Sequence, residues 1–203
     1  MSRIVIASRN RGKIGEITAI LSGPGIELSS LDAFPPYPEP EETGTTFTEN
    51  AMIKARAAFE ATGMPSLADD SGIVVDALGG EPGVRSARYG GEGLTDAERC
   101  EALLKAMKKV PAGERTARFM CVMVLFPAPH DPLKAFVTEG ILEGEIAFEP
   151  SGENGFGYDP VFFVPGKGKT VAMMDGGEKN RISHRYRALV EMKGLLRGWR
   201  GDE

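Results

Sequence analysis

Short apolar segments typical of strands alternate with amphipathic segments typical of helices along the 203 residues of this chain. The pattern predicts strands at 3–7, 26–28, 67–68, 73–75, 118–126 and 161–164, one or two strands within 134–148, and helices at 12–21, 46–61, 95–109 and 183–196. Thr46 and Glu49 match a capping box, which marks the start of the second helix. Alternation of this kind favours an α/β fold with a mixed, elongated β-sheet.

The composition is that of a globular protein with a real core. Hydrophobic residues make up 41% of the chain and charged residues 26%. The length suits one large domain or two small ones. A formal net charge of −5 makes duplex nucleic acid and anionic membranes poor partners, although a local basic cluster can still bind a small anion.

The two cysteines, Cys100 and Cys121, are not arranged in a spacing typical of metal sites. We expect both to be reduced and buried, which fits a cytoplasmic location. The first apolar run, residues 4–7, is too short for a signal peptide, and no run reaches the roughly 20 residues of a membrane helix.

Two predicted helices begin with cations, although helix N-termini prefer acidic residues and a cation there costs roughly 0.3–1 kcal/mol. Arg9, Arg11 and Lys13 surround the start of the first helix, and Lys179, Arg181, His184, Arg185 and Arg187 surround the start of the last. Free backbone N–H groups at such ends bind phosphate well. We therefore expect two helix starts that face phosphate; the alternative is solvated surface charge. Neither a Walker loop nor a dinucleotide-binding GxGxxG motif is present.

Carboxylates occur as two adjacent pairs, Glu41–Glu42 and Asp69–Asp70. Carboxylate oxygens suit Mg²⁺, which one or two of them usually hold together with substrate phosphates. Successive strand residues point to opposite faces, so Asp69 and Asp70 are not expected to bind one ion. One would face the site and the other would cap the turn, and periodicity does not choose between them. The alternative is a simple Asp-Ser-Gly turn.

The segment "GFGYDP", residues 155–160, places two glycines around Phe156. Glycines let the backbone approach a ligand, and an aromatic ring at a loop tip can stack on a nucleobase. Asp159 offers an acceptor for a base edge or a ribose. The alternative is a tight turn with Phe156 in the core. His130 is expected in an exposed loop without a role, and His184 draws attention because it neighbours Arg185.

Taken together, "ASRNRGK", "EETGTTFTENAMIKA", "ADDSGIVVDALGGEPGVRSARYGG", "GFGYDPVFF" and "ISHRYRAL" resemble the Ham1/RdgB/ITPase family of pyrophosphatases, in the family's order and spacing. The resemblance implies one ITPase-like domain over residues 1–203, with two lobes that share an elongated mixed sheet and a central cleft. It also implies a homodimer, and Mg²⁺-dependent hydrolysis of ITP, dITP and XTP to the monophosphate and pyrophosphate, which cleanses the nucleotide pool.

The same resemblance implies roles for individual residues. Asp70 would be the general base and a metal ligand, and Glu41 a second metal ligand. The triphosphate would be bound by Ser8, Arg9, Asn10, Arg11, Gly12 and Lys13, with Lys54 as a further cation. The rest of the nucleotide would be bound by Ser71, Phe156, Gly157, Tyr158, Asp159, Lys179, His184 and Arg185. Gly176-Gly177, just before Lys179, departs from the more helical and charged pattern of many relatives.

Two other readings remain open. A Maf-type pyrophosphatase acting on modified pyrimidine nucleotides is disfavoured by "SHR" and "GFGYDP". A nucleotide-binding regulatory protein without catalysis would need the cations but not the carboxylates, so Glu41 and Asp70 favour an enzyme.

Overall fold

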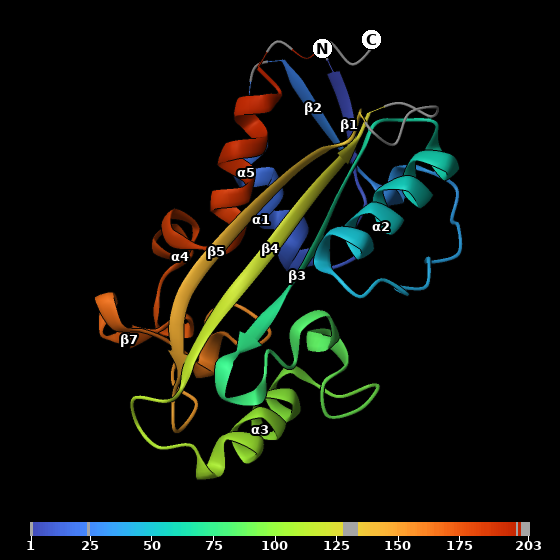
Figure 1. Ribbon diagram of the computed structural model, residues 1–203. Coiled ribbons are helices and arrows are strands. Elements are labelled where there is room, and N and C mark those ends of the chain that lie inside the picture. Colours follow the sequence, from blue (N-terminus) through green and yellow to red (C-terminus); the bar gives the residue numbers. More distant parts are fainter. Residues whose placement is uncertain (1, 24, 128–133, 198, 200–203) are drawn as a thin grey trace. The chain divides into compact units, whose positions relative to one another are not determined.

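The computed structural model describes all residues of the chain except 1, 24, 128–133, 198 and 200–203 (Figure 1). His130, expected in an exposed loop, therefore lies outside the described residues. The strands are β1 (Ser2–Ile6), β2 (Ile26–Ser30), β3 (Ser66–Val75), β4 (Thr116–Phe126), β5 (Phe136–Ile146), β6 (Phe162–Val164) and β7 (Lys169–Thr170). The α-helices are α1 (Arg11–Leu21), α2 (Phe47–Thr62), α3 (Asp96–Ala106), α4 (Gly176–Ile182) and α5 (His184–Leu195).

The strands form one mixed sheet in the order β2-β1-β3-β4-β5-β6-β7. β1 runs parallel to β2 and to β3, with Ile6 opposite Leu67, whereas β6 runs antiparallel to both β5 and β7. The α/β class and the mixed sheet that the sequence predicts are thus confirmed.

The chain divides into two compact units. The first contains Met1–Asp70, Cys121–Gly140 and Arg185–Glu203, and the second contains Ser71–Met120 and Ile141–His184. Strands β3, β4 and β5 each contribute residues to both units. The prediction that residues 1–203 form a single domain stays a prediction.

In the first unit, alternate residues of the sheet face different helices, as the pleat of a strand requires. Ile6, Leu67 and Leu125 belong to a buried cluster that also contains residues of α1 and α5, among them Leu21 and Leu189. The next residue of β4, Phe126, instead lies edge-on against Phe59 of α2, with ring centroids 5.4 Å apart. α1 and α5 therefore cover one face of β3 and β4, and α2 covers the other (Figure 1).

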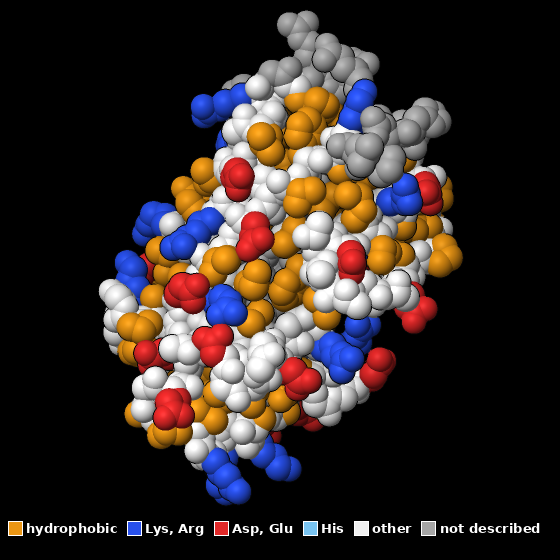
Figure 2. Space-filling view, in the orientation of Figure 1, with side chains coloured by type: hydrophobic (Ala, Val, Ile, Leu, Met, Phe, Trp, Pro, Cys, Tyr) orange, Lys and Arg blue, Asp and Glu red, His pale blue; other side chains and the backbone are white. Residues whose placement is uncertain are grey.

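The second unit has its own core, in which α3 packs against the parts of β3, β4 and β5 that belong to this unit. It is formed by Ile73, Val75, Cys100, Leu103, Met107, Ala117, Phe119, Leu142, Ile146, Tyr158, Val161, Phe162, Val164, Val171 and Met174. Both cysteines are buried and unbridged, as expected. On the face that Figure 2 shows, Lys and Arg side chains are interspersed with Asp and Glu side chains, as on a solvated surface.

One expectation about secondary structure is wrong. Residues 66–75 form one continuous strand, β3, so Asp69 and Asp70 lie inside a strand and not in a turn between two. No element is predicted over residues 176–182, which form the short helix α4 despite Gly176-Gly177. Asp175 explains this helix, because its side chain accepts a hydrogen bond from the Glu178 N–H at 2.7 Å and so caps the first turn.

The helix boundaries otherwise follow the sequence signals. The Thr46–Glu49 capping box is formed, and a second capping box joins Thr95 and Glu98 at the start of α3. Among the described residues, no helix combines the length and apolar character needed to cross a bilayer.

Candidate active site

The loop between β1 and α1 is shaped by its own polar side chains. Asn10 caps α1, since its Oδ1 accepts from the Lys13 N–H at 3.1 Å, and Ser8 Oγ accepts from the Asn10 N–H at 3.2 Å. Arg9 donates to the Tyr37 carbonyl at 2.8 Å and thereby holds the proline-rich segment beside the loop. The first turn of α1 contains no acidic residue. The loop thus presents a cationic helix start, as the sequence predicts.

Asp69 is the centre of a buried ion-pair cluster on the face of β3 that α1 and α5 cover. Its Oδ2 lies 3.1 Å from Lys13 Nζ and accepts from Arg185 Nη2 at 2.9 Å. Arg185 also pairs with Glu16 through Nη1, and both Arg185 and Asp69 are almost completely buried. Burial alone would raise the pKa of Asp69, but Lys13 and Arg185 outweigh it and hold this pKa far below its usual range. Asp69 is therefore a fixed negative charge.

Asp70 lies on the opposite face of the same strand, toward α2. Its Oδ1 accepts from Lys54 Nζ at 2.6 Å, and its Oδ2 lies 3.5 Å from the Asn50 amide nitrogen. The same ammonium donates to Glu42 Oε1 at 2.8 Å. Burial raises the pKa of Asp70 above its usual value, although Lys54 opposes the shift. Burial would lower the pKa of Lys54, but its carboxylate neighbours, led by Asp70, raise it.

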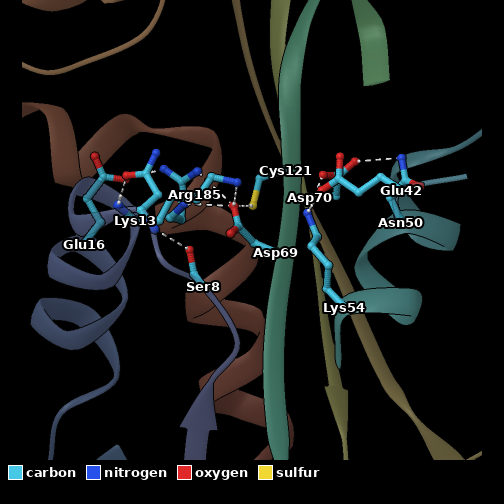
Figure 3. Close-up of polar contacts among 11 residues, drawn as sticks. Ser8, Lys13, Glu16, Glu42, Asn50, Lys54, Asp69, Asp70, Cys121 and Arg185 are labelled. Atoms are coloured by element: carbon cyan, nitrogen blue, oxygen red, sulfur yellow. Dashed lines mark hydrogen bonds and ion pairs between the residues drawn. The ribbon is translucent and has the colours of Figure 1, made fainter. Parts of the chain in front are cut away.

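The two aspartates thus belong to separate clusters (Figure 3). Lys13, Glu16 and Arg185 gather around Asp69 on one side of β3, while Lys54, Glu42 and Asn50 gather around Asp70 on the other. This separation follows from the two-residue period of a strand. Asp70 shares its face with a second carboxylate, Glu42, whereas Asp69 is neutralised by Lys13 and Arg185.

Glu42, not Glu41, is the carboxylate that approaches Asp70. Glu41 is exposed, whereas the Glu42 side chain is only 26% exposed and shares the Lys54 ammonium with Asp70. Two hard oxygen donors that converge on one cationic group fit Mg²⁺, which usually keeps its remaining positions for water and substrate phosphates. Within the described parts of the chain, no group of three or more His, Cys, Asp or Glu side chains is placed to hold a metal ion.

A second group of predicted site residues lies in the second unit. Lys179 Nζ, on α4, lies 2.7 Å from Asp159 Oδ2 and 4.3 Å from the centre of the Phe156 ring. The same carboxylate oxygen of Asp159 accepts from the Phe156 N–H at 2.9 Å. Asp159 and Lys179 are both buried, so this pair forms a fixed support beneath Phe156.

The remaining predicted residues are placed as follows. Tyr158 is buried, and its hydroxyl donates to the Ser86 carbonyl at 2.7 Å. His184, at the start of α5, is buried and stacks on Phe119 with ring centroids 4.9 Å apart. Ser71 is half-buried on β3 directly after Asp70. Arg11 is exposed, whereas Gly12 and Gly157 are partly exposed.

Several residues of these clusters are absent from the sequence-based site: Glu16, Glu42, Asn50 and, as a buried partner, Asp69. Two of them leave a sequence signal, because Glu16 stands three residues after Lys13 on α1 and Asn50 four residues before Lys54 on α2. Such spacings place side chains on one helix face.

Comparison with known proteins gives a consistent result. The family model described as the Ham1 family matches residues 4–195. A dITP/XTP pyrophosphatase from Geobacter sulfurreducens is 51% identical over 203 residues, 100% of each chain. One from Geobacillus kaustophilus is 50% identical over 192 residues, 95% of this chain and 93% of that protein.

Solved structures agree with the sequence comparisons. A Ham1 protein from Coxiella burnetii superposes with a TM-score of 0.90 at 46% identity, over 98% of this chain and 100% of the other. The Ham1 protein from Staphylococcus aureus superposes with a TM-score of 0.86 at 42% identity, over 97% and 99%. The sequence comparisons and the structural comparisons therefore identify the same family.

Proposed function

The chain belongs to the Ham1 family, and from this premise we propose that it is a dITP/XTP pyrophosphatase. It hydrolyses non-canonical purine nucleoside triphosphates, including ITP, to the monophosphate and pyrophosphate. The relatives from Geobacter sulfurreducens and Geobacillus kaustophilus carry this name, and they match nearly the whole chain. The role is that of a house-cleaning hydrolase for the nucleotide pool.

The observation that best supports this proposal is the division of charge on β3. Asp70 and Glu42 face one ammonium group, Lys54, and the cationic start of α1 with Lys13 belongs to the same unit. A triphosphate tail needs cations for its oxygens and carboxylates for a metal ion. Although Lys13 and Asp70 lie on opposite faces of β3, Lys13 is near enough to oppose the rise in the Asp70 pKa, so this unit supplies both kinds of group close together.

Asp70 acts as the general base. Its raised pKa means that it accepts a proton more readily than an exposed carboxylate, which favours removal of a proton from the attacking water. Lys13 and Lys54 stabilise the charge that builds up on the departing pyrophosphate. Asp70 and Glu42 would hold Mg²⁺, which when bound would neutralise charge and polarise the α-phosphoryl group. Glu41, which the family resemblance favours as a ligand, is the neighbouring alternative.

The second group of residues binds the base. Phe156 offers a ring for stacking, and its support by Asp159 and Lys179 keeps that ring in place. Hypoxanthine and xanthine carry a C6 carbonyl acceptor where adenine carries an amino donor. Backbone N–H groups and donors such as Arg185 would pair with the carbonyl, and an unmatched buried group can supply discrimination of up to about 10⁴–10⁵.

Arg185 has a further requirement in this role. Its guanidinium is already paired with Asp69 and Glu16, so it can bind a base only with an N–H group that these carboxylates leave available or after it releases one of them.

The same proposal includes a homodimer, a cytoplasmic location, and a nucleoside triphosphate, not a nucleic-acid polymer or a membrane, as the partner.

The deciding experiment is incubation with ITP, XTP, GTP and ATP in the presence of Mg²⁺, with pyrophosphate and orthophosphate resolved. We expect pyrophosphate from ITP and XTP, with ATP spared. Release of orthophosphate would instead indicate a phosphatase that attacks the γ-phosphate. Saturable binding without turnover would indicate a regulatory nucleotide-binding protein.

A further inference from the structure

The loop of residues 155–159, with the sequence GFGYD, is stabilised by contacts among its own residues. Asp159 Oδ2 accepts from the Phe156 N–H at 2.9 Å and lies so close to Gly155 that a Cβ there would come within 2.0 Å of it. Gly155 also has a φ of +80°, which disfavours any other residue. The position of Phe156 is therefore set by the backbone around it.

The same loop is anchored from outside by α3. Asp96 Oδ2 accepts from the Gly157 N–H at 2.7 Å, and the Cys100 thiol donates to the Gly157 carbonyl at 3.4 Å. Both polar groups of the residue that follows Phe156 are thus bound to the first turns of one helix.

Asp96 is itself held in place, which makes it a precise anchor. Its other carboxylate oxygen pairs with Arg99, and the guanidinium of Arg99 also bonds to the carbonyls of Leu94 and Ala87. The helix start does not depend on Asp96, because Thr95 and Glu98 form the capping box of α3 by themselves. The two oxygens of the Asp96 carboxylate therefore bind the loop and Arg99, and not the helix N-terminus.

We propose that Asp96 is a positioning residue for base binding: through the Gly157 amide it fixes Phe156 and, with Asp159, the Lys179 ammonium beside the ring. This inference rests on the proposed function, because it takes the loop to be part of the nucleotide site. Asp96 touches neither the phosphate-binding loop nor the carboxylates around Asp70, which belong to the other unit. Its loss should affect the base end of the nucleotide alone.

The test compares wild type with Asp96→Ala and Asp96→Asn, using Glu98→Gln as the matched control in the same helical turn. The probes are inosine monophosphate, inorganic pyrophosphate and ITP turnover. We expect Asp96→Ala to raise the KM for ITP and weaken inosine monophosphate binding by about tenfold, the scale of one charge-assisted hydrogen bond. Asp96→Asn, which keeps an acceptor oxygen, should lose about threefold. Pyrophosphate affinity and kcat should stay near wild type in both, and Glu98→Gln should leave all of these values unchanged.

Amide hydrogen exchange provides a second measurement. Asp96→Ala should speed exchange at residues 155–159, whereas Glu98→Gln should speed it only in the first turn of α3. If Asp96→Ala does not fold, the threefold loss in Asp96→Asn decides the matter. Wild-type affinity for inosine monophosphate in the folded variants, or an equal loss of pyrophosphate affinity, would overturn the positioning role. A wild-type protein that neither binds nor cleaves inosine nucleotides would refute the proposed function as well, so the two failures are distinguishable.

Discussion

Asp69 and Asp70 are neighbours in β3, yet their carboxylates point to opposite faces of the strand and pair with different lysines. Asp69 lies 3.1 Å from Lys13, and Asp70 lies 2.6 Å from Lys54. Burial and neighbouring charges shift their pKa values in opposite directions, downward for Asp69 and upward for Asp70. The folded protein therefore favours the ionised form of Asp69 more strongly than that of Asp70.

Replacement of Asp70 by asparagine should abolish most turnover and leave the fold intact. A general base typically contributes about 10²–10⁴-fold to the rate, and asparagine cannot accept the proton. Because Lys54 keeps Glu42 as a partner and burial of the Asp70 charge is itself unfavourable, the loss of stability should be small. Pyrophosphate release from ITP and urea unfolding measure the two effects. Near-normal turnover in this variant would refute the role of Asp70.

Replacement of Asp69 by asparagine should lower the stability much more than replacement of Asp70. It leaves Arg185 and Lys13 without their shared carboxylate oxygen, and breaking a buried ion pair by removing one partner costs about 3–5 kcal/mol. Urea unfolding of the Asp69 and Asp70 variants side by side provides a matched comparison. Equal stability of the two variants would contradict the assignment of Asp69 as the buried structural charge.

The two adjacent glutamates should differ in their effect on metal dependence. Glu42→Gln should raise the Mg²⁺ concentration for half-maximal activity by about 10-fold or more, the scale of losing even an outer contact of a metal site. Glu41→Gln should change it little, because Glu41 is exposed and Glu42 shares Lys54 with Asp70. Activity measured over a Mg²⁺ titration separates the two variants. A larger effect from Glu41→Gln would return the ligand role to that residue.

Stability at acidic pH should report on the capping box of α2. Hydrogen bonds from the backbone and side chain of Thr45 and from Thr46 hold the pKa of Glu49 below its ordinary value. A lowered folded-state pKa means that this contribution is present above the unfolded-state pKa, about 4.3, and is lost as the pH falls through the folded-state pKa. The Tm difference between wild type and Glu49→Gln should therefore shrink as the pH is lowered from about 6 to about 3. A difference that is independent of pH would contradict this origin.

Much of the fold could be predicted because its signals are local. The Thr46–Glu49 capping box and the apolar face of residues 12–21 depend on neighbours three or four positions apart, and both predictions are confirmed. The continuous strand β3 was missed because Asp69, Asp70, Ser71 and Gly72 have turn-forming composition. Ion pairs that stabilise these aspartates inside a strand come from residues far away in the chain and override the local preference.

The site was predicted less completely for the same reason. The family resemblance favours Asp70 over Asp69, but the partners of Asp69 lie 116 residues away at Arg185 and on α1 at Lys13. Glu42 and Glu41 have identical chemistry, and only the path of the chain before α2 determines which one reaches Lys54. Asp96 and Gly157 are 61 residues apart, so no local pattern links them.

The alternation within β3 also limits how this strand can change its length. A deletion or insertion of a single residue just before Asp69 would exchange the directions of the two carboxylates, because the side-chain period of a strand is two. Asp70 would then point toward the side of β3 that Lys13 and Arg185 occupy, while Asp69 would point toward the side of α2. The fold should thus tolerate conservative substitutions of Leu67 or Ala68, whereas it should not tolerate the deletion of either residue.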